Sequence, residues 1–188
     1  MLRTKKILVP ALLMGTALAW TVNWQSSANA QIADGIGQSL AVVIQGTATG
    51  ELRMIDGVEM NCFDVDLVDA ASGRIIGRGT DCLDLDSIVP DPGGGAGFSI
   101  SNTQFFHLPG GTIKSRHRTT IQPVLEGSPG ITHITGAIPA APNILGGTGR
   151  YRDAEGTVRL TGAVDLSRLA GENIITFDCV FRIDLSDK

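Results

Sequence analysis

The chain has 188 residues, of which 43% are hydrophobic, 18% charged and 5% aromatic, so it builds one ordinary domain with a buried core. Its 24 glycines follow no G-X-Y period, which excludes a collagen-like chain, and the hydrophobic content excludes a disordered one. A net charge of −4 disfavours nucleic-acid binding, because phosphate backbones are bound through clustered cations.

Residues 1–30 have the features of a secretory signal peptide. Three cations within residues 3–6 precede an apolar run over residues 7–20, and Ala28 and Ala30 are the small residues that signal peptidase requires. The run is shorter than the roughly 20 residues that span a bilayer, which favours a cleaved leader over a membrane anchor. The sequence therefore predicts cleavage after Ala30, a secreted or periplasmic protein, and no membrane association of the mature chain.

Cleavage would make the protein more acidic. The leader carries three cations and no acid, so 12 Lys and Arg remain against 19 Asp and Glu over 158 residues, a net charge of −7. Trp20 and Trp24 both belong to the leader, which leaves Tyr151 and six Phe as the mature aromatic residues. The acidic charge therefore excludes nucleic acid as a partner. Few aromatic side chains remain on which bases or sugars could stack.

Residues 31–188 alternate between apolar and polar positions in short runs, a pattern that predicts an all-β domain. Turn-forming residues separate the runs, as in 69–73, 109–111 and 170–173, and imply antiparallel neighbours. The Gly- and Pro-rich segment 90–97 is either a mobile loop or a low-complexity linker. Eight such strands suit a closed barrel or a sandwich, and closure would remove exposed sheet edges. The expected strands cover residues 39–48, 58–68, 74–86, 98–108, 112–124, 131–138, 157–166 and 174–185.

The alternation also indicates which face of its predicted strand each of the three cysteines occupies. Cys62 and Cys82 lie on the polar faces of two consecutive strands joined by a short turn, whereas Cys179 lies on the apolar face of the last strand. In an exported protein, three cysteines allow one bridge and one free thiol. We therefore predict a Cys62–Cys82 disulfide and a buried, free Cys179.

Four aspartates share the polar faces that carry this disulfide. Asp64 and Asp66 follow Cys62 at alternate positions, and Asp84 and Asp86 follow Cys82. Clustered carboxylates suit a calcium ion, but the spacing matches no calcium loop, so a solvated strand face is the alternative interpretation.

Several side chains are candidates to face a barrel lumen. His117 shares the apolar side of its strand with Ile113 and Ile121, His133 lies on the next strand where it could face His117, and Phe177 and Phe181 lie on the apolar side of the last strand. His117 is either a general acid or base or a structural residue satisfied by a neighbouring hydroxyl. Two histidines are too few to predict a zinc site, so no metal is assigned.

The sequence carries no motif of a known catalytic or cofactor site. It has no serine nucleophile elbow, H-E-x-x-H or C-x-x-C, which disfavours hydrolase and redox functions. The glycines at 146–149 lack the G-x-G-x-x-G register and no helix follows them, so no nucleotide cofactor is predicted. These glycines allow a tight turn beneath which Tyr151 can plug the core.

The run G-G-T-G-R-Y-R-D-A-E-G-T-V at residues 146–158 resembles the G-G-T-G-x-[FY]-x-x-A-x-G signature of the allene oxide cyclase and dirigent superfamily. The stretch 66–77 is similar to that superfamily's D-x-L-x-D-x-x-G-x-x-I-G segment. Dirigent proteins have A-R-G where this chain has Ala154-Glu155-Gly156, and no other pocket residue of the family matches a position here.

The resemblance implies a calycin-like barrel of eight antiparallel strands with an apolar lumen, assembled as a homotrimer. The lumen would bind a small hydrophobic molecule, with His117, His133, Tyr151, Phe177 and Phe181 as the candidate ligand-binding residues and no cofactor. Two functions fit this expectation. One is a cofactor-free isomerase or cyclase; the other is a non-catalytic binding or structural barrel filled by its own side chains.

Overall fold

A computed structural model describes residues 38–91, 94–125 and 130–186, all of which belong to one compact unit, Ala33–Lys188. The predicted leader and its cleavage site after Ala30 lie outside the described residues. The described chain consists mainly of ten strands, together with a short 3₁₀ helix, η1 (Gly149–Tyr151), and a one-turn helix, α1 (Leu169–Glu172). The strands are β1 (Ser39–Thr49), β2 (Glu51–Ile55), β3 (Val58–Asp69), β4 (Ile75–Pro90), β5 (Phe98–Leu108), β6 (Gly111–Pro123), β7 (His133–Ala137), β8 (Ile144–Gly147), β9 (Gly156–Asp165) and β10 (Ile174–Leu185).

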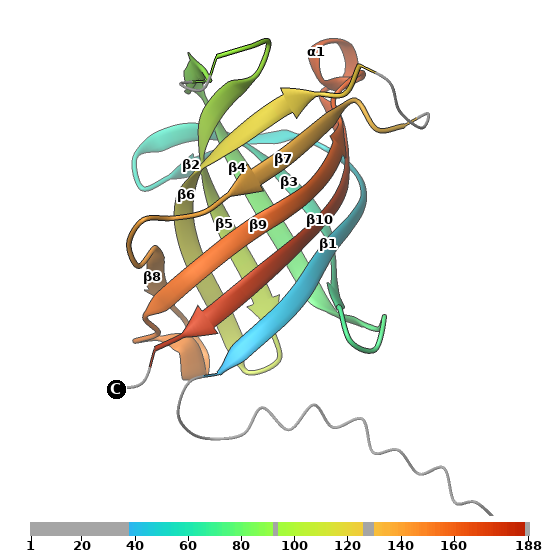
Figure 1. Ribbon diagram of the computed structural model, residues 1–188. Coiled ribbons are helices and arrows are strands. Elements are labelled where there is room, and N and C mark those ends of the chain that lie inside the picture. Colours follow the sequence, from blue (N-terminus) through green and yellow to red (C-terminus); the bar gives the residue numbers. More distant parts are fainter. Residues whose placement is uncertain (1–37, 92–93, 126–129, 187–188) are drawn as a thin grey trace, which may run out of the picture. The chain divides into compact units, whose positions relative to one another are not determined.

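Eight of these strands close into an antiparallel barrel (Figure 1). The hydrogen-bonded order is β1-β10-β9-β7-β6-β5-β4-β3, and β3 pairs with β1 to close the circle. The first and last strands, blue and red in Figure 1, run side by side over eleven residue pairs, from Ser39–Asp184 to Thr49–Ile174. The prediction of an all-β, eight-stranded antiparallel barrel is confirmed, because all eight expected strands form the wall.

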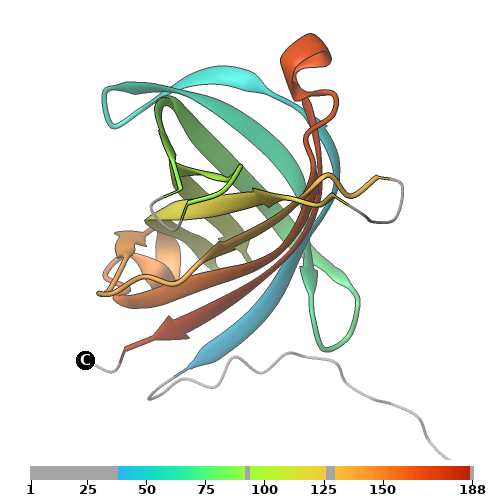
Figure 2. The same ribbon diagram turned by 45° about the horizontal axis from the view of Figure 1, so that its top comes forward.

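Two further strands lie outside the predicted set. β8 is a four-residue segment that pairs with β6. β2 follows β1 after a single glycine and pairs with β3 through a tight turn at Asp56 and Gly57, which have φ angles of 50° and 83°. Asp-Gly with two positive φ angles is the usual two-residue hairpin turn. The resulting β2–β3 hairpin lies outside the barrel wall (Figure 2).

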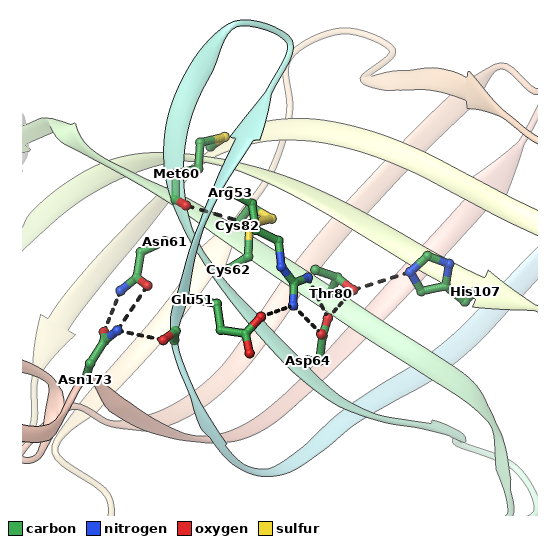
Figure 3. A network of polar contacts seen from close by, with 11 residues as sticks. Glu51, Arg53, Met60, Asn61, Cys62, Asp64, Thr80, Cys82, His107 and Asn173 are labelled. Carbon is green, nitrogen blue, oxygen red and sulfur yellow. Dashed lines mark hydrogen bonds and ion pairs between the residues drawn. A yellow bond between two sulfur atoms is a disulfide. The ribbon is translucent and has the colours of Figure 1, made fainter.

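β1 and β3 separate where this hairpin begins. They pair only from Val42–Asp69 to Gln45–Asp66. Beyond that point Asn173, which has a left-handed backbone conformation (φ 56°), lies between the two separating strands (Figure 3). Its amide donates to the carbonyl of Gly50 at 2.9 Å and accepts from Asn61 Nδ2 at 2.6 Å. A side-chain amide thus substitutes for the missing strand-to-strand hydrogen bonds.

The lumen holds the main hydrophobic core. Alternate residues of each wall strand point inward, and the aromatic rings among them pack edge to face. Phe106 meets Phe181 with ring centroids 5.3 Å apart, and Phe63 meets Phe177 at 5.8 Å. All four rings are buried, so the barrel is closed by side-chain packing as well as by main-chain pairing.

The predicted disulfide is confirmed. Cys62 and Cys82 are direct partners across β3 and β4 and form a bridge with an S–S distance of 2.05 Å, while Cys179 is buried and free. The bridge lies on the outer side of the wall, yet both cysteines are fully buried. They form a second small core with Met60, onto which Ile55 and Phe105 pack.

Candidate functional site

An apolar cavity lies in the half of the lumen nearest the end of β6. Its volume is about 30 Å³. Side chains of β4, β5, β6, β7, β9 and β10 line it, among them Leu83, Ile100, Leu160, Val164, Phe177 and Phe181. Because ligand pockets for drug-sized molecules measure roughly 300–1,000 Å³, this cavity is too small for such a ligand, and the protein's own side chains fill most of this half of the lumen.

A chain of buried polar side chains borders the cavity. Thr119 Oγ1 donates to Asn102 Oδ1 at 2.9 Å, and Asn102 Nδ2 donates to Asp81 Oδ1 at 3.1 Å. These residues come from three adjacent strands, β6, β5 and β4, and all are at least nine-tenths buried. Each polar group therefore has a partner, as a buried polar group requires.

Asp81 is the ionisable group of this chain. Burial raises the pKa of its carboxyl from 3.8 to about 6, and the hydrogen bond from Asn102 partly offsets that effect. The carboxyl therefore exchanges a proton close to neutral pH, which suits a general acid or base. Burial, together with the nearby Asp81 charge, also raises the pKa of the Cys179 thiol to about 12, so this cysteine is a packed apolar residue and not a nucleophile.

His117 lies in the lumen as predicted, opposite Asn102 on the neighbouring strand. Burial lowers the pKa of its imidazole to about 4, so the ring is neutral at physiological pH. Neither ring nitrogen has a hydrogen-bond partner within the described ranges, and the same is true of the Ser115 hydroxyl. The expectation of a histidine satisfied by a neighbouring hydroxyl is therefore wrong for this geometry.

His133 does not face His117. It pairs with Pro123, six positions further along β6, which places the two histidines about 20 Å apart along the strand. Its Nδ1 lies 2.9 Å from Thr132 Oγ1, and its ring stands edge-on to Phe98 with the centroids 6.4 Å apart. His133 is half-buried and does not line the cavity.

The three aromatic candidates divide between the two halves of the barrel. Phe177 and Phe181 line the cavity. Tyr151 is buried in η1, next to the turn at Gly110 near the start of β6, and its hydroxyl accepts a hydrogen bond from Arg150 Nη2. Tyr151 therefore packs the core beneath its glycine-rich turn, as the sequence predicts, and it is remote from the cavity.

The aspartates on the outer faces of β3 and β4 do not form a shared metal-binding group within the described residues. Asp64 forms an ion pair with Arg53, at 2.6 Å, and accepts a hydrogen bond from Thr80 Oγ1, also at 2.6 Å (Figure 3). These contacts, with the guanidinium of Arg53 first among them, lower the pKa of Asp64 to about 2. Within the part of the chain that the structure describes, no three His, Cys, Asp or Glu side chains form a metal-binding group, so the calcium interpretation has no geometric basis.

Sequence reasoning missed Asp81 and Asn102 as members of the site. The available signal was the parity of β4, because Asp81 occupies the same face as Leu83 and places a carboxylate among inward-facing residues. Asn102 alternates in the same way with Ile100.

The site and the wall together define a closed antiparallel β-barrel with a narrow, acid-containing lumen. No model of a known protein family matches the chain, and no curated protein sequence matches it significantly. None of the helices in residues 38–91, 94–125 and 130–186 has the length and apolar character needed to cross a membrane.

Proposed function

We propose that the chain is an exported, non-catalytic barrel whose lumen is its packed core and which binds its partners through its surface. The observation that carries this proposal is the small volume of the lumen cavity described above, about 30 Å³, enough for two or three water molecules. The Cys62–Cys82 bridge supports export, because disulfides persist in oxidising compartments, and so does the signal-peptide pattern of residues 1–30.

A second candidate function keeps the lumen as a binding or catalytic site for a small hydrophobic molecule. The observation that favours it is Asp81, a carboxyl of near-neutral pKa beside apolar side chains. A cofactor-free isomerase or cyclase, which the resemblance to allene oxide cyclases implies, needs such a proton-exchanging group next to an apolar ligand. This function requires Phe177 or its neighbours to move aside when the ligand enters.

Native mass spectrometry of protein purified from its source separates the two candidates. The packed-core proposal predicts a mass without a bound small molecule. Val164→Phe fills the cavity, and Val180→Phe, on the exposed face of β10, is the matched control. A co-purified lipid or terpenoid that is lost in Val164→Phe and retained in Val180→Phe would overturn the packed-core proposal in favour of the lumen site.

The resemblance also implies a homotrimer, which we propose as the assembled state. Light scattering coupled to size exclusion tests it directly: a single peak with three times the mass of the mature chain is expected, and a monomer mass would contradict it.

A further inference from the structure

The β2–β3 hairpin folds back over the outer face of the barrel, and ion pairs between its turn and β6 hold it there. Its turn residue Asp56 lies 2.6 Å from Lys114 Nζ and 2.6 Å from Arg116 Nη2, both on the outer face of β6. The underside of the hairpin is apolar: Ile55 packs with Met60 onto the disulfide and Phe105. The hairpin therefore crosses the outside of β4 and β5 to reach β6.

A cavity of about 240 Å³ lies under this hairpin. Val58 and Met60 of the hairpin line one side, and the outward-facing side chains of three wall strands line the other. Those wall residues are Asp84 on β4, Ser101 and Thr103 on β5, and Arg116 on β6; Asn102 of β5, which also lines the lumen cavity, borders this cavity too. This cavity is about eight times larger than the one in the lumen, and it does not share the apolar lining of the lumen.

The two charged residues at its ends have unused binding capacity. The Asp84 carboxylate forms no ion pair with any described residue. Arg116 uses Nε on Thr103 Oγ1, at 3.2 Å, and Nη2 on Asp56. Its Nη1 donates to no group in the described ranges.

The cation and the anion lie on opposite sides of β5. Adjacent strands are about 4.8 Å apart, so the main chains at Asp84 and Arg116 are roughly 10–12 Å apart. Both side chains extend into the cavity, so the distance between the carboxylate and the guanidinium is shorter and matches the length of a small molecule. The Ser101 and Thr103 hydroxyls lie between them, and Val58 and Met60 supply an apolar surface above.

We propose that this cavity, named here the hairpin pocket, binds a small zwitterion of amino-acid size with an aliphatic side chain. The ligand's ammonium group pairs with Asp84, its carboxylate takes the free Nη1 of Arg116, and its aliphatic part packs against Val58 and Met60. A ligand with both charges is favoured over one with a single charge, because only a ligand with both charges pairs with Asp84 and with the free Nη1 of Arg116 at the same time. This proposal rests on the surface-binding role above and names its ligand class.

Isothermal titration with three molecules of similar size tests the charge requirement. L-leucine carries both groups, 4-methylpentanoate lacks the ammonium and 3-methylbutylamine lacks the carboxylate. We expect saturable binding of L-leucine and at least tenfold weaker binding of the other two. Equal binding of all three, or no heat of binding with L-leucine, would overturn the proposal.

Two variants assign the binding to the hairpin pocket. Asp84→Asn is expected to weaken L-leucine binding at least tenfold and to remove the preference over 4-methylpentanoate. Asp86→Asn changes an exposed carboxylate two residues further along β4. It is expected to leave the L-leucine affinity and the preference over 4-methylpentanoate unaltered. Thermal melting confirms that each variant is folded. Unchanged L-leucine affinity in folded Asp84→Asn would contradict the assignment.

The lumen variant keeps this proposal distinct from the packed-core proposal. Val164→Phe is expected to leave L-leucine affinity unchanged, because it fills the lumen and not the hairpin pocket. Loss of L-leucine binding in folded Val164→Phe would place the ligand in the lumen and contradict the hairpin pocket. A co-purified apolar ligand alongside intact L-leucine binding would overturn only the packed lumen.

Discussion

Asn102 Nδ2 donates a 3.1 Å hydrogen bond to Asp81 Oδ1 across β4 and β5, inside the barrel. This amide holds the carboxyl in a site where burial favours its neutral form. The barrel thus contains a lumen carboxyl whose pKa lies within two units of neutrality.

The stability of the protein should depend on the protonation of Asp81. Folding raises its pKa from 3.8 to about 6, so the folded state binds the proton more tightly than the unfolded chain. The stabilisation is complete below about pH 3.8 and is lost as the pH rises through about 6, by up to about 3 kcal/mol.

Asp81→Asn removes this titration and keeps an oxygen that accepts from Asn102. In urea unfolding at pH 4 and pH 8, the variant should gain stability relative to the wild type by up to about 3 kcal/mol at the higher pH. Ser115→Ala, a buried lumen change without a charge, is the control, and its difference from the wild type should not vary with pH. A constant difference for Asp81→Asn would show that the carboxyl is not destabilised by burial.

Gly149, in the G-G-T-G turn, should tolerate no side chain. Its φ is +58°, and a Cβ there would lie 2.1 Å from the carbonyl oxygen of Gly110. Gly73 has a similar φ of +67°, but nothing lies within 4 Å of its Cβ position. Gly73→Ala should cost about 1 kcal/mol, the penalty of the left-handed backbone alone, and Gly149→Ala at least about 2 kcal/mol more. Equal losses in chemical denaturation would contradict the close approach of these two turns.

The Cys62–Cys82 bridge should contribute about 3 kcal/mol to the free energy of unfolding. The estimate follows from the loop entropy that a bridge between residues 20 positions apart removes from the unfolded chain. Urea unfolding with and without dithiothreitol measures it, and Cys62→Ala/Cys82→Ala should show no effect of the reductant. In Cys179→Ala the effect of the reductant should persist, because that thiol is free. A reductant effect absent from the wild type would contradict a stabilising bridge.

Asp64→Asn should lose the ion pair with Arg53. Contact with Arg53 lowers the pKa of Asp64 to about 2, so the pair stabilises the fold above about pH 3.8 and this contribution disappears as the pH falls through 2. Because both side chains are about one-third exposed, solvent screening limits the loss to about 1 kcal/mol at pH 7.

Asp66→Asn is the matched control for Asp64→Asn, since Asp66 is an exposed carboxylate on the same face of β3. It should change stability by less than about 0.5 kcal/mol in the same unfolding assay. High salt should reduce the difference between the two variants. Equal losses at pH 7 would mean that the Arg53 contact contributes nothing beyond a general charge effect.

Strand parity is what made the wall of the barrel predictable. Because successive side chains point to opposite faces, the pattern alone placed Cys62 opposite Cys82 and turned Cys179 inward, and both placements are confirmed. The same reasoning buried His117 in the lumen. It could not set the level of His133, which depends on how far β7 is displaced along β6.

The two strands that the sequence did not predict, β2 and β8, are short and lack a clear alternation of apolar and polar residues. β8 contains two glycines in four residues, and β2 follows β1 with only Gly50 between them. The Asp56-Gly57 pair was a hairpin signal that the strand pattern obscured. Neither the lumen volume nor the hairpin pocket could be predicted, since both depend on how side chains from strands distant in sequence fill the same space.

The pairing of β1 with β10 joins the first and last strands of the barrel. One strand of this ladder is the first of the barrel and the other is the last, so no segment of the chain that lacks either strand can form the complete wall. Contacts of such long sequence separation slow folding in general, and this ladder joins residue 39 to residue 184. A circular permutation that joins these neighbouring strand ends and opens the chain at the β3–β4 turn would make the β1–β10 pairing a local hairpin, and we expect the permuted protein to fold faster.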